Sequence, residues 1–210
     1  MKIFKLISFF SKSKIDASVS RFSIPSTLDN LSKDLQAKIV EFQTKIGFIP
    51  NIILLMSRRP DECKAFFDYH DILMKQTNSS LTKSEKEMIV VATSGSNHCQ
   101  YCVVAHGAIL RVYEKNPLIS DQISINYKKS GLSLRHSLML DFAMKVNRDS
   151  ENLMEEDYEL MYKNNFNEED LWDITSISSF FAMSNRIANS SFLKPNVEFF
   201  SMGRLPKPKS

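Results

Sequence analysis

One stretch near the middle of the chain, from Glu87 to His106, constrains the fold more than any other. It holds two cysteines three positions apart, Cys99 and Cys102, and His106 follows four positions later. Positions i, i+3 and i+7 of an α-helix share one face, so these three side chains would project together. Glu87 can meet them if the stretch is two helices joined at residues 94–96. The pattern therefore predicts a dithiol that has its own base.

Apolar residues recur at helical spacing along nearly the whole chain, which predicts an all-α fold. Residues 88–92 are apolar on every side, so the helix that contains them should run through the core. The length of 210 residues favours one domain with a sizeable core. The expected helices are 33–46, 52–58, one that begins at residue 60, one opened by residue 82, one capped by residue 97 and continuing to about residue 113, 134–146, 155–164 and 168–192.

Capping residues mark where the two central helices should begin. Thr82 and Glu85 have the spacing of a capping box, which opens the first of them. Asn97 is expected to cap the second, with Gln100 returning the hydrogen bond. Cys99 would then be the second helical residue. The positive helix end supplies roughly 0.3–1 kcal/mol, less than the roughly 1.4 kcal/mol of one pKa unit, so the helix dipole alone does not activate the thiol.

A thiol reacts as its thiolate, so its neighbours decide which cysteine is activated. His106 can take a proton from Cys102, or stand beside the thiolate as a cation. Glu87 can orient His106 or act as the base itself. The helix dipole favours Cys99 as the more acidic thiol, whereas His106 and Glu87 favour Cys102. Cys63 lies on an apolar helical face and is expected to be a plain core thiol.

Two other readings of the same residues are possible. The four side chains Glu87, Cys99, Cys102 and His106 are suitable zinc ligands, but the chain has no second CxxC and no histidine pair to support such a site. The cluster can also be purely structural. We expect redox chemistry with neither a metal nor a cofactor.

Charge and cysteine content exclude several classes of protein. The 27 basic and 24 acidic residues are nearly balanced and scattered, which argues against a nucleic-acid partner. Three cysteines are too few for a secreted disulfide framework and favour a reducing, cytoplasmic location. No apolar run approaches the roughly 20 residues that span a bilayer, so no integral membrane segment is expected.

The two ends of the chain are expected to lie outside the domain, which we place at residues 20–203. Residues 1–14 are basic, free of acids and partly amphipathic. The first 19 residues are expected to be a disordered or loosely docked extension, with organelle targeting or contact with a membrane surface as the alternative. Residues 204–210 should form a flexible tail.

The pattern Glu-x11-Cys-x-x-Cys-x3-His, with Asn97 and Tyr101 around it, resembles the alkylhydroperoxidase D-like superfamily, which includes carboxymuconolactone decarboxylases. Three flanking motifs, residues 47–51, 140–143 and 180–188, occur in the same order in its branch of peroxidase-related proteins. The resemblance covers roughly residues 20–203. One position departs from alkylhydroperoxidase D itself, which has a histidine where this chain has Tyr101. Tyr101 is expected to be an accessory residue that orients Glu87 by a hydrogen bond.

The resemblance implies an alkylhydroperoxidase D-like helical bundle with a peroxide-reducing dithiol. Cys102 would attack a small hydroperoxide and become a sulfenic acid, which Cys99 would resolve to a disulfide. Glu87 and His106 would form the proton relay. A dithiol reductant, lipoyl-like or thioredoxin-like, would restore the pair by exchange at Cys99. The family also implies a homo-oligomer.

Two functions of other classes fit the same residues. In a carboxymuconolactone decarboxylase-like enzyme, His106 and Glu87 would be the acid and base, and the thiols would be incidental. In a non-enzymatic redox sensor, disulfide formation would change the state of assembly. The last motif contains Asn185 and Arg186. Arg186 can hold a carboxylate near the site or bridge helices, and we expect the structural role.

Overall fold

The computed structural model describes residues 17–25 and 31–204 of the chain. Within these residues every regular element is a helix, which confirms the all-α prediction. No described helix has both the length and the apolar character needed to cross a membrane. The elements are η1 (Ala17–Val19), α2 (Lys33–Ile46), α3 (Asn51–Met56), α4 (Pro60–Lys75), α5 (Lys83–Ser96), α6 (Gln100–Glu114), α7 (Ile119–Asn126), η2 (Tyr127–Lys129), α8 (Leu134–Asp149), η3 (Ser150–Asn152), α9 (Glu155–Lys163), α10 (Glu168–Ser190) and α11 (Glu198–Ser201).

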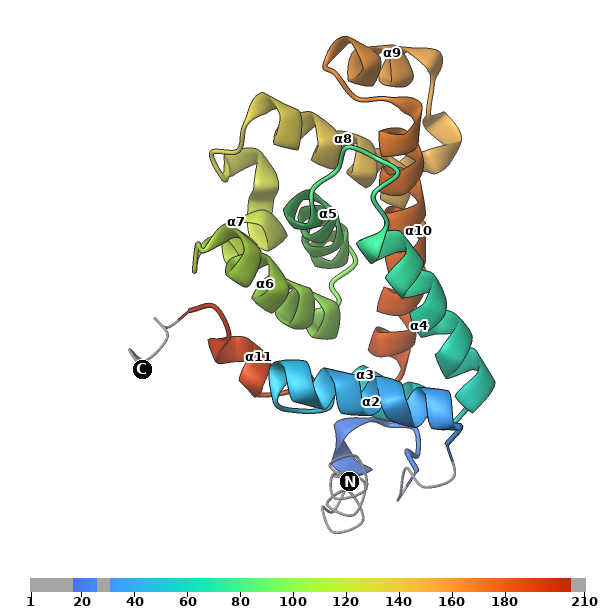
Figure 1. Cartoon of the computed structure of the whole chain (residues 1–210). Coiled ribbons are helices and arrows are strands. Elements are labelled where there is room, and N and C mark those ends of the chain that lie inside the picture. Colours follow the sequence, from blue (N-terminus) through green and yellow to red (C-terminus); the bar gives the residue numbers. More distant parts are fainter. Residues whose placement is uncertain (1–16, 26–30, 205–210) are drawn as a thin grey trace.

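Helix α5 is the centre of the fold. It packs against α4, α6, α7, α8 and α10, which surround it in Figure 1. Every residue from Glu85 to Ser94 is buried, as expected for a helix whose middle is apolar on all sides. The main apolar core forms around Met88–Ala92 and includes side chains from α2, α4, α8 and α10.

Local sequence explains where the helices begin and end. The Ser32 hydroxyl accepts a hydrogen bond from the Leu35 N–H and caps α2, and Gly47 ends this helix with a φ of +88°. Thr82 and Glu85 form the predicted capping box at the start of α5. These boundaries are the ones that the sequence predicts.

The predicted junction between α5 and α6 is wrong. We placed it at residues 94–96, but α5 continues to Ser96, and Asn97 is the C-cap of α5 rather than the N-cap of α6. Gly95 lies inside α5, and a glycine is needed at this position because α7 crosses the helix closely. A Cβ atom at this position would lie 2.5 Å from the Ser124 carbonyl oxygen. The glycine therefore serves helix packing, and the chain turns later, at His98, whose φ is +51°.

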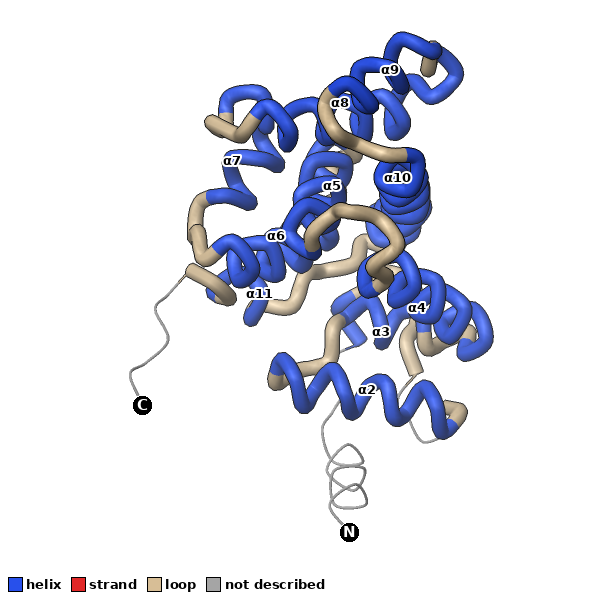
Figure 2. Tube along the Cα trace, turned by 45° about the horizontal axis from the view of Figure 1, so that its top comes forward, coloured by secondary structure: helices blue, strands red, loops and turns tan. Residues whose placement is uncertain are grey.

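The segment that follows α10 is tied by hydrogen bonds to the start of α3. The Asn51 N–H donates to the Asn196 side chain, and the Asn51 amide donates to the Lys194 carbonyl, both at 2.8 Å. The Asn196 amide returns a hydrogen bond to the Ile49 carbonyl. Figure 2 shows α2, α3 and α4 grouped at one end of the molecule, and α8 and α9 at the other. The motif at residues 47–51 is therefore a turn that anchors the first of these groups.

The ends of the chain carry few described residues. Val19 is buried, and its carbonyl accepts a hydrogen bond from the Lys194 N–H. Residues 1–16 and 205–210 hold most of the expected extension and tail, and they lie outside the described residues. The predicted domain boundaries therefore stay predictions.

Replacing Lys86 by Met should destabilise the fold. The Lys86 ammonium is fully buried, lies 2.7 Å from an Asp173 carboxylate oxygen, and donates to the Leu73 and Gln76 carbonyls that end α4. Removing it leaves a buried, unpaired carboxylate, so we expect the free energy of unfolding in urea to fall by about 3–5 kcal/mol.

Two further variants test this explanation. Combining Lys86→Met with Asp173→Asn should recover part of the loss, because the unpaired charge is gone. The control Lys163→Met removes an exposed pair with Glu159 and should change the free energy of unfolding by less than about 0.5 kcal/mol. Equal effects of Lys86→Met and Lys163→Met would contradict the assigned role of the buried pair.

Candidate active site

The two cysteines lie at the start of α6, in a small apolar cluster separate from the main core. Cys99 is the N-cap residue and Cys102 lies in the first turn, so Cys99 is not the second helical residue that we predicted. Both thiols are buried and free. The cluster is completed by apolar side chains from α3, α10 and α11, among them Leu55, Ala188 and Phe199. Both sulfur atoms are thus held in a water-poor environment.

The environment separates the acidities of the two thiols. The pKa of Cys99 is lowered to about 7, chiefly because the Cys102 thiol donates a hydrogen bond to its sulfur. Burial opposes this shift, while the Cys102 N–H, the Asn185 side chain and the charge of His106 add to it. The pKa of Cys102 is raised because it is the donor of that bond and is buried beside a negative sulfur. Cys99 is therefore the more acidic thiol of the pair.

Cys99 is more acidic than Cys102, as the helix dipole predicts, but the dipole is not the main cause of the difference in pKa. An N-cap residue sits where orphan backbone N–H groups favour an anion. The larger contributions come from Cys102 and Asn185, which supply hydrogen bonds to the sulfur. The thiolate is thus stabilised mainly by specific neighbours.

His106 and Glu87 are paired by a hydrogen bond, as predicted. The His106 Nδ1 lies 2.8 Å from a Glu87 carboxylate oxygen, and both side chains are largely buried. The Phe181 ring packs edge-on against the imidazole, with ring centroids 4.7 Å apart. The carboxylate and the ring together hold the imidazole in one orientation. His106 lies one helical turn from Cys102 on the same face of α6.

Asn185, in α10, is a site residue whose role the sequence analysis missed. Its amide donates to the Ser94 hydroxyl at 3.0 Å, and its carbonyl oxygen accepts from the Asn97 amide at 2.9 Å. Its hydrogen bonds to the two cysteines lower the pKa of Cys99 further and oppose the rise in the pKa of Cys102. Asn97 therefore contributes as part of this network and not as a helix N-cap. Only the position of Asn185 in the last family-like motif pointed to it.

Tyr101 does not take the role predicted for it. Its hydroxyl oxygen accepts a hydrogen bond of 3.1 Å from the Ile52 N–H at the start of α3, instead of orienting Glu87. The ring is buried, and burial raises the pKa of the phenol. A phenol in this setting keeps its proton at neutral pH and is no proton relay. Tyr101 instead braces α3 against α6.

A cavity of about 500 Å³ reaches the Glu87 side chain. Glu87 forms part of its wall, together with residues of α2, α4 and α6. The α6 residues are Ile109 and Tyr113, which continue the face that carries Cys99, Cys102 and His106 at spacings of three and four. One helix face therefore joins the dithiol, the base and the cavity.

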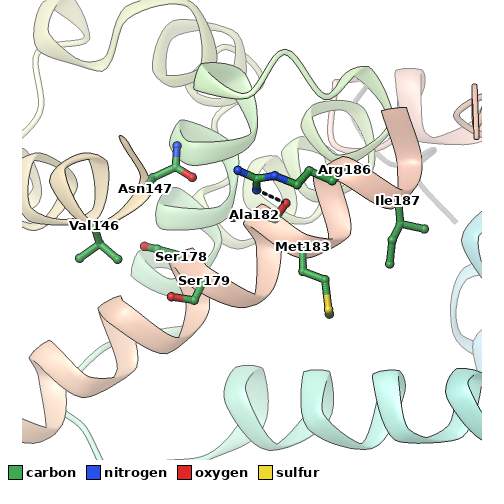
Figure 3. Close-up of a pocket in the computed structure, with 8 residues that line it drawn as sticks. All are labelled: Val146, Asn147, Ser178, Ser179, Ala182, Met183, Arg186 and Ile187. Atoms are coloured by element: carbon green, nitrogen blue, oxygen red, sulfur yellow. Dashed lines mark hydrogen bonds between the residues drawn. The ribbon is translucent and has the colours of Figure 1, made fainter. Parts of the chain in front are cut away.

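A second cavity, of about 490 Å³, lies between α8 and α10. Figure 3 shows Arg186 in its wall, with the guanidinium donating to the Ala182 carbonyl of its own helix at 2.7 Å. The prediction that Arg186 bridges helices is wrong for the described residues, since this bond stays within α10. Asn147, also in the wall, donates to Asn97 and thereby joins the asparagine network.

No cluster of three or more His, Cys, Asp or Glu side chains in residues 17–25 and 31–204 is arranged to hold a metal ion. The chemistry available to these residues is that of a thiolate, a thiol and an imidazole–carboxylate pair.

The comparisons with known proteins concern this same region and the whole fold. The model of the carboxymuconolactone decarboxylase family matches residues 60–117. A peroxidase-related protein from Ralstonia eutropha JMP134, described as having an alkylhydroperoxidase AhpD core, is 52% identical with a TM-score of 0.87, over 90% of this chain and 98% of that one. Another, from Silicibacter sp. TM1040, is 34% identical with a TM-score of 0.83, over 92% of this chain and 100% of that one.

More distant similarity shows the fold alone. The debrominase Bmp8 is 18% identical, with a TM-score of 0.66 over 81% of this chain and 90% of that one. No curated protein matches the sequence.

The charge of the dithiol should change near neutral pH. Because the pKa of Cys99 is lowered to about 7, its ultraviolet thiolate absorbance should rise through about pH 7. In Cys102→Ala the sulfur loses its main hydrogen-bond donor, so the midpoint should move to higher pH. Cys63→Ala is the control and should leave the midpoint unchanged, because burial raises the pKa of Cys63 to about 11. A midpoint that Cys102→Ala does not move would contradict the assigned cause.

Replacing Tyr101 by Phe separates bracing from proton transfer. The change leaves the buried Ile52 N–H without its partner, so the free energy of unfolding should fall by about 1–3 kcal/mol. The thiolate midpoint should stay where it is, because the phenol does not share the thiol proton. A shifted midpoint with unchanged stability would show that Tyr101 belongs to the proton network.

Proposed function

Because the chain belongs to the alkylhydroperoxidase D-like superfamily, in its branch of peroxidase-related proteins, we propose that it is a thiol-dependent peroxidase. It reduces hydroperoxides through the Cys99–Cys102 dithiol. The observation that carries the proposal is a pair of buried, free thiols at the start of α6, one helical turn from an imidazole that a carboxylate oxygen holds at 2.8 Å. A purely structural cysteine pair needs no such arrangement.

The first step consumes the peroxide. A thiolate sulfur attacks the terminal oxygen of the hydroperoxide, the O–O bond breaks, and the alkoxide that leaves takes a proton to become an alcohol. The sulfur becomes a sulfenic acid. The second thiol then attacks that sulfur and displaces its oxygen as water, which forms a disulfide. Two thiols are oxidised, and one hydroperoxide is reduced to an alcohol and water.

We assign the attack on the peroxide to Cys102 and the resolution to Cys99. Cys99 is the more acidic thiol and ionises first, because the Cys102 thiol donates a hydrogen bond to its sulfur. Moving that proton from Cys102 to Cys99 creates a Cys102 thiolate one helical turn from His106. His106, held by Glu87, supplies the proton that the alkoxide needs, and the proton of the resolving Cys99 thiol leaves with the displaced oxygen as water. His106 regains a proton when the dithiol reductant, which brings two protons, restores the pair.

The disulfide is restored by a dithiol reductant, lipoyl-like or thioredoxin-like. Its thiolate attacks the Cys99 sulfur, forms a mixed disulfide and releases Cys102, and its second thiol then releases Cys99. Both sulfurs are buried, and we assign the exchange to Cys99 because its neighbour His98 is exposed at the turn before α6. Two electrons pass from the reductant to the pair in each cycle.

A carboxymuconolactone decarboxylase-like function is the second candidate. The His106–Glu87 hydrogen bond of 2.8 Å favours it, because an oriented imidazole is an acid–base catalyst in its own right. The family model over residues 60–117 supports either function. The two candidates differ in whether the thiols are needed.

We also propose that the protein acts as a homo-oligomer. Several large apolar side chains are exposed, and Trp172 on α10 is 68% exposed. Burial of Trp172 and other exposed apolar side chains against a second copy would remove their apolar surface from water.

Substitution of each cysteine tests the peroxidase. Cys102→Ser should abolish hydroperoxide consumption in the presence of a dithiol reductant, because serine is no comparable nucleophile at neutral pH. Cys99→Ser should still react once and should accumulate a sulfenic acid on Cys102, detectable by trapping and mass measurement. Cys63→Ser is the matched control and should retain the full rate.

Other outcomes identify the other functions. Full hydroperoxide consumption by Cys102→Ser would refute the peroxidase with Cys102 as its nucleophile. Turnover of a carboxymuconolactone-like substrate by the double Cys99→Ser, Cys102→Ser variant would establish the decarboxylase. Disulfide formation that changes the oligomer mass without peroxide turnover would indicate a redox sensor.

A further inference from the structure

The cavity beside Glu87 is larger than hydrogen peroxide requires. Its volume of about 500 Å³ lies within the range of small-molecule sites, roughly 300–1,000 Å³. Apolar side chains from four positions, Phe42, Ile46, Met74 and Ile109, line it together with Tyr113. These side chains fit the carbon skeleton of an organic molecule.

The same cavity is lined by lysines. Lys38 and Lys75 both pair with Asp71, at 3.1 and 2.8 Å, and Lys45 pairs with Glu41. Lys83 is exposed, and no carboxylate of the described residues pairs with it. The cavity therefore holds one cation that is available to an anionic ligand.

The position of Lys83 sets the direction of such a ligand. Ser84, the next residue, hydrogen-bonds to Glu114 at the end of α6, so Lys83 lies beside the end of α6 that is remote from the cysteines. From Tyr113 to Cys102 the distance along the helix axis is about 16 Å, at about 1.5 Å per residue. An elongated ligand with its anionic end at Lys83 would extend along α6 toward the dithiol.

We propose that this cavity binds a long-chain carboxylic acid hydroperoxide, with its carboxylate on Lys83 and its chain along Ile109. The proposal rests on the peroxidase function, because it names the substrate class of that same site. The hydroperoxide group reaches the His106–Glu87 pair, one helical turn from Cys102.

The test compares linoleic acid hydroperoxide with its methyl ester, which has the same chain without the charge. Wild-type protein should reduce the acid with a kcat/KM about tenfold higher, the ratio that about 1.4 kcal/mol of binding supports. Lys83→Gln should bring the ratio close to one and leave the rate with tert-butyl hydroperoxide unchanged. Lys129→Gln is the control, since Lys129 is equally exposed, also lacks an ion pair within the described residues and lies in η2.

A binding measurement separates this inference from the peroxidase itself. Wild-type protein should bind linoleate, which has no peroxide group, and Lys83→Gln should weaken that affinity about tenfold while Lys129→Gln does not. If the wild type consumes no hydroperoxide at all, the proposed function fails and linoleate binding alone decides the inference. Equal linoleate affinity in the wild type and Lys83→Gln, or equal reduction of acid and ester by the wild type, would overturn it.

Discussion

The fold depends on how three consecutive ionisable residues, Glu85–Glu87, are accommodated inside a buried helix. Successive side chains of an α-helix point about a quarter-turn apart, so the three reach different neighbours. Glu85 pairs with Arg135 of α8, Lys86 with Asp173 of α10, and Glu87 with His106 of α6. Burying any of them unpaired would cost several kcal/mol. The pairs therefore orient three surrounding helices about α5 more specifically than apolar packing does.

One of these three pairs is also the acid–base pair of the candidate site, which links stability to chemistry. Glu87 must have a partner because it is buried, and His106 is fixed because it is that partner. Under the proposed function, the imidazole is therefore already oriented for proton transfer before a substrate binds. The free energy needed to hold this side chain in one orientation is supplied by folding of the core.

The sequence predicts the helices well but the details of the site less well, for identifiable reasons. Periodicity and capping residues are local, so α2 and the start of α5 were predicted correctly. Gly95 was taken for a junction because the close crossing of α7 is a tertiary contact that no local pattern shows. The same holds for Asn185, which meets the cysteines across a long sequence separation. Pairing of His106 with Glu87 was predictable because a buried carboxylate in that position needs a partner.

The two thiols differ in acidity because they occupy different positions at the start of α6. Cys99 accepts hydrogen bonds at the N-cap, whereas Cys102 donates one and lies nearer to His106 on the same helix face. One negative charge shared by two sulfurs can serve both halves of a catalytic cycle without a second ionisation. The cavity opens toward Glu87, and the exposed His98 borders Cys99. Under the proposed function, substrate and reductant therefore approach opposite ends of one stripe of α6, so neither has to displace the other.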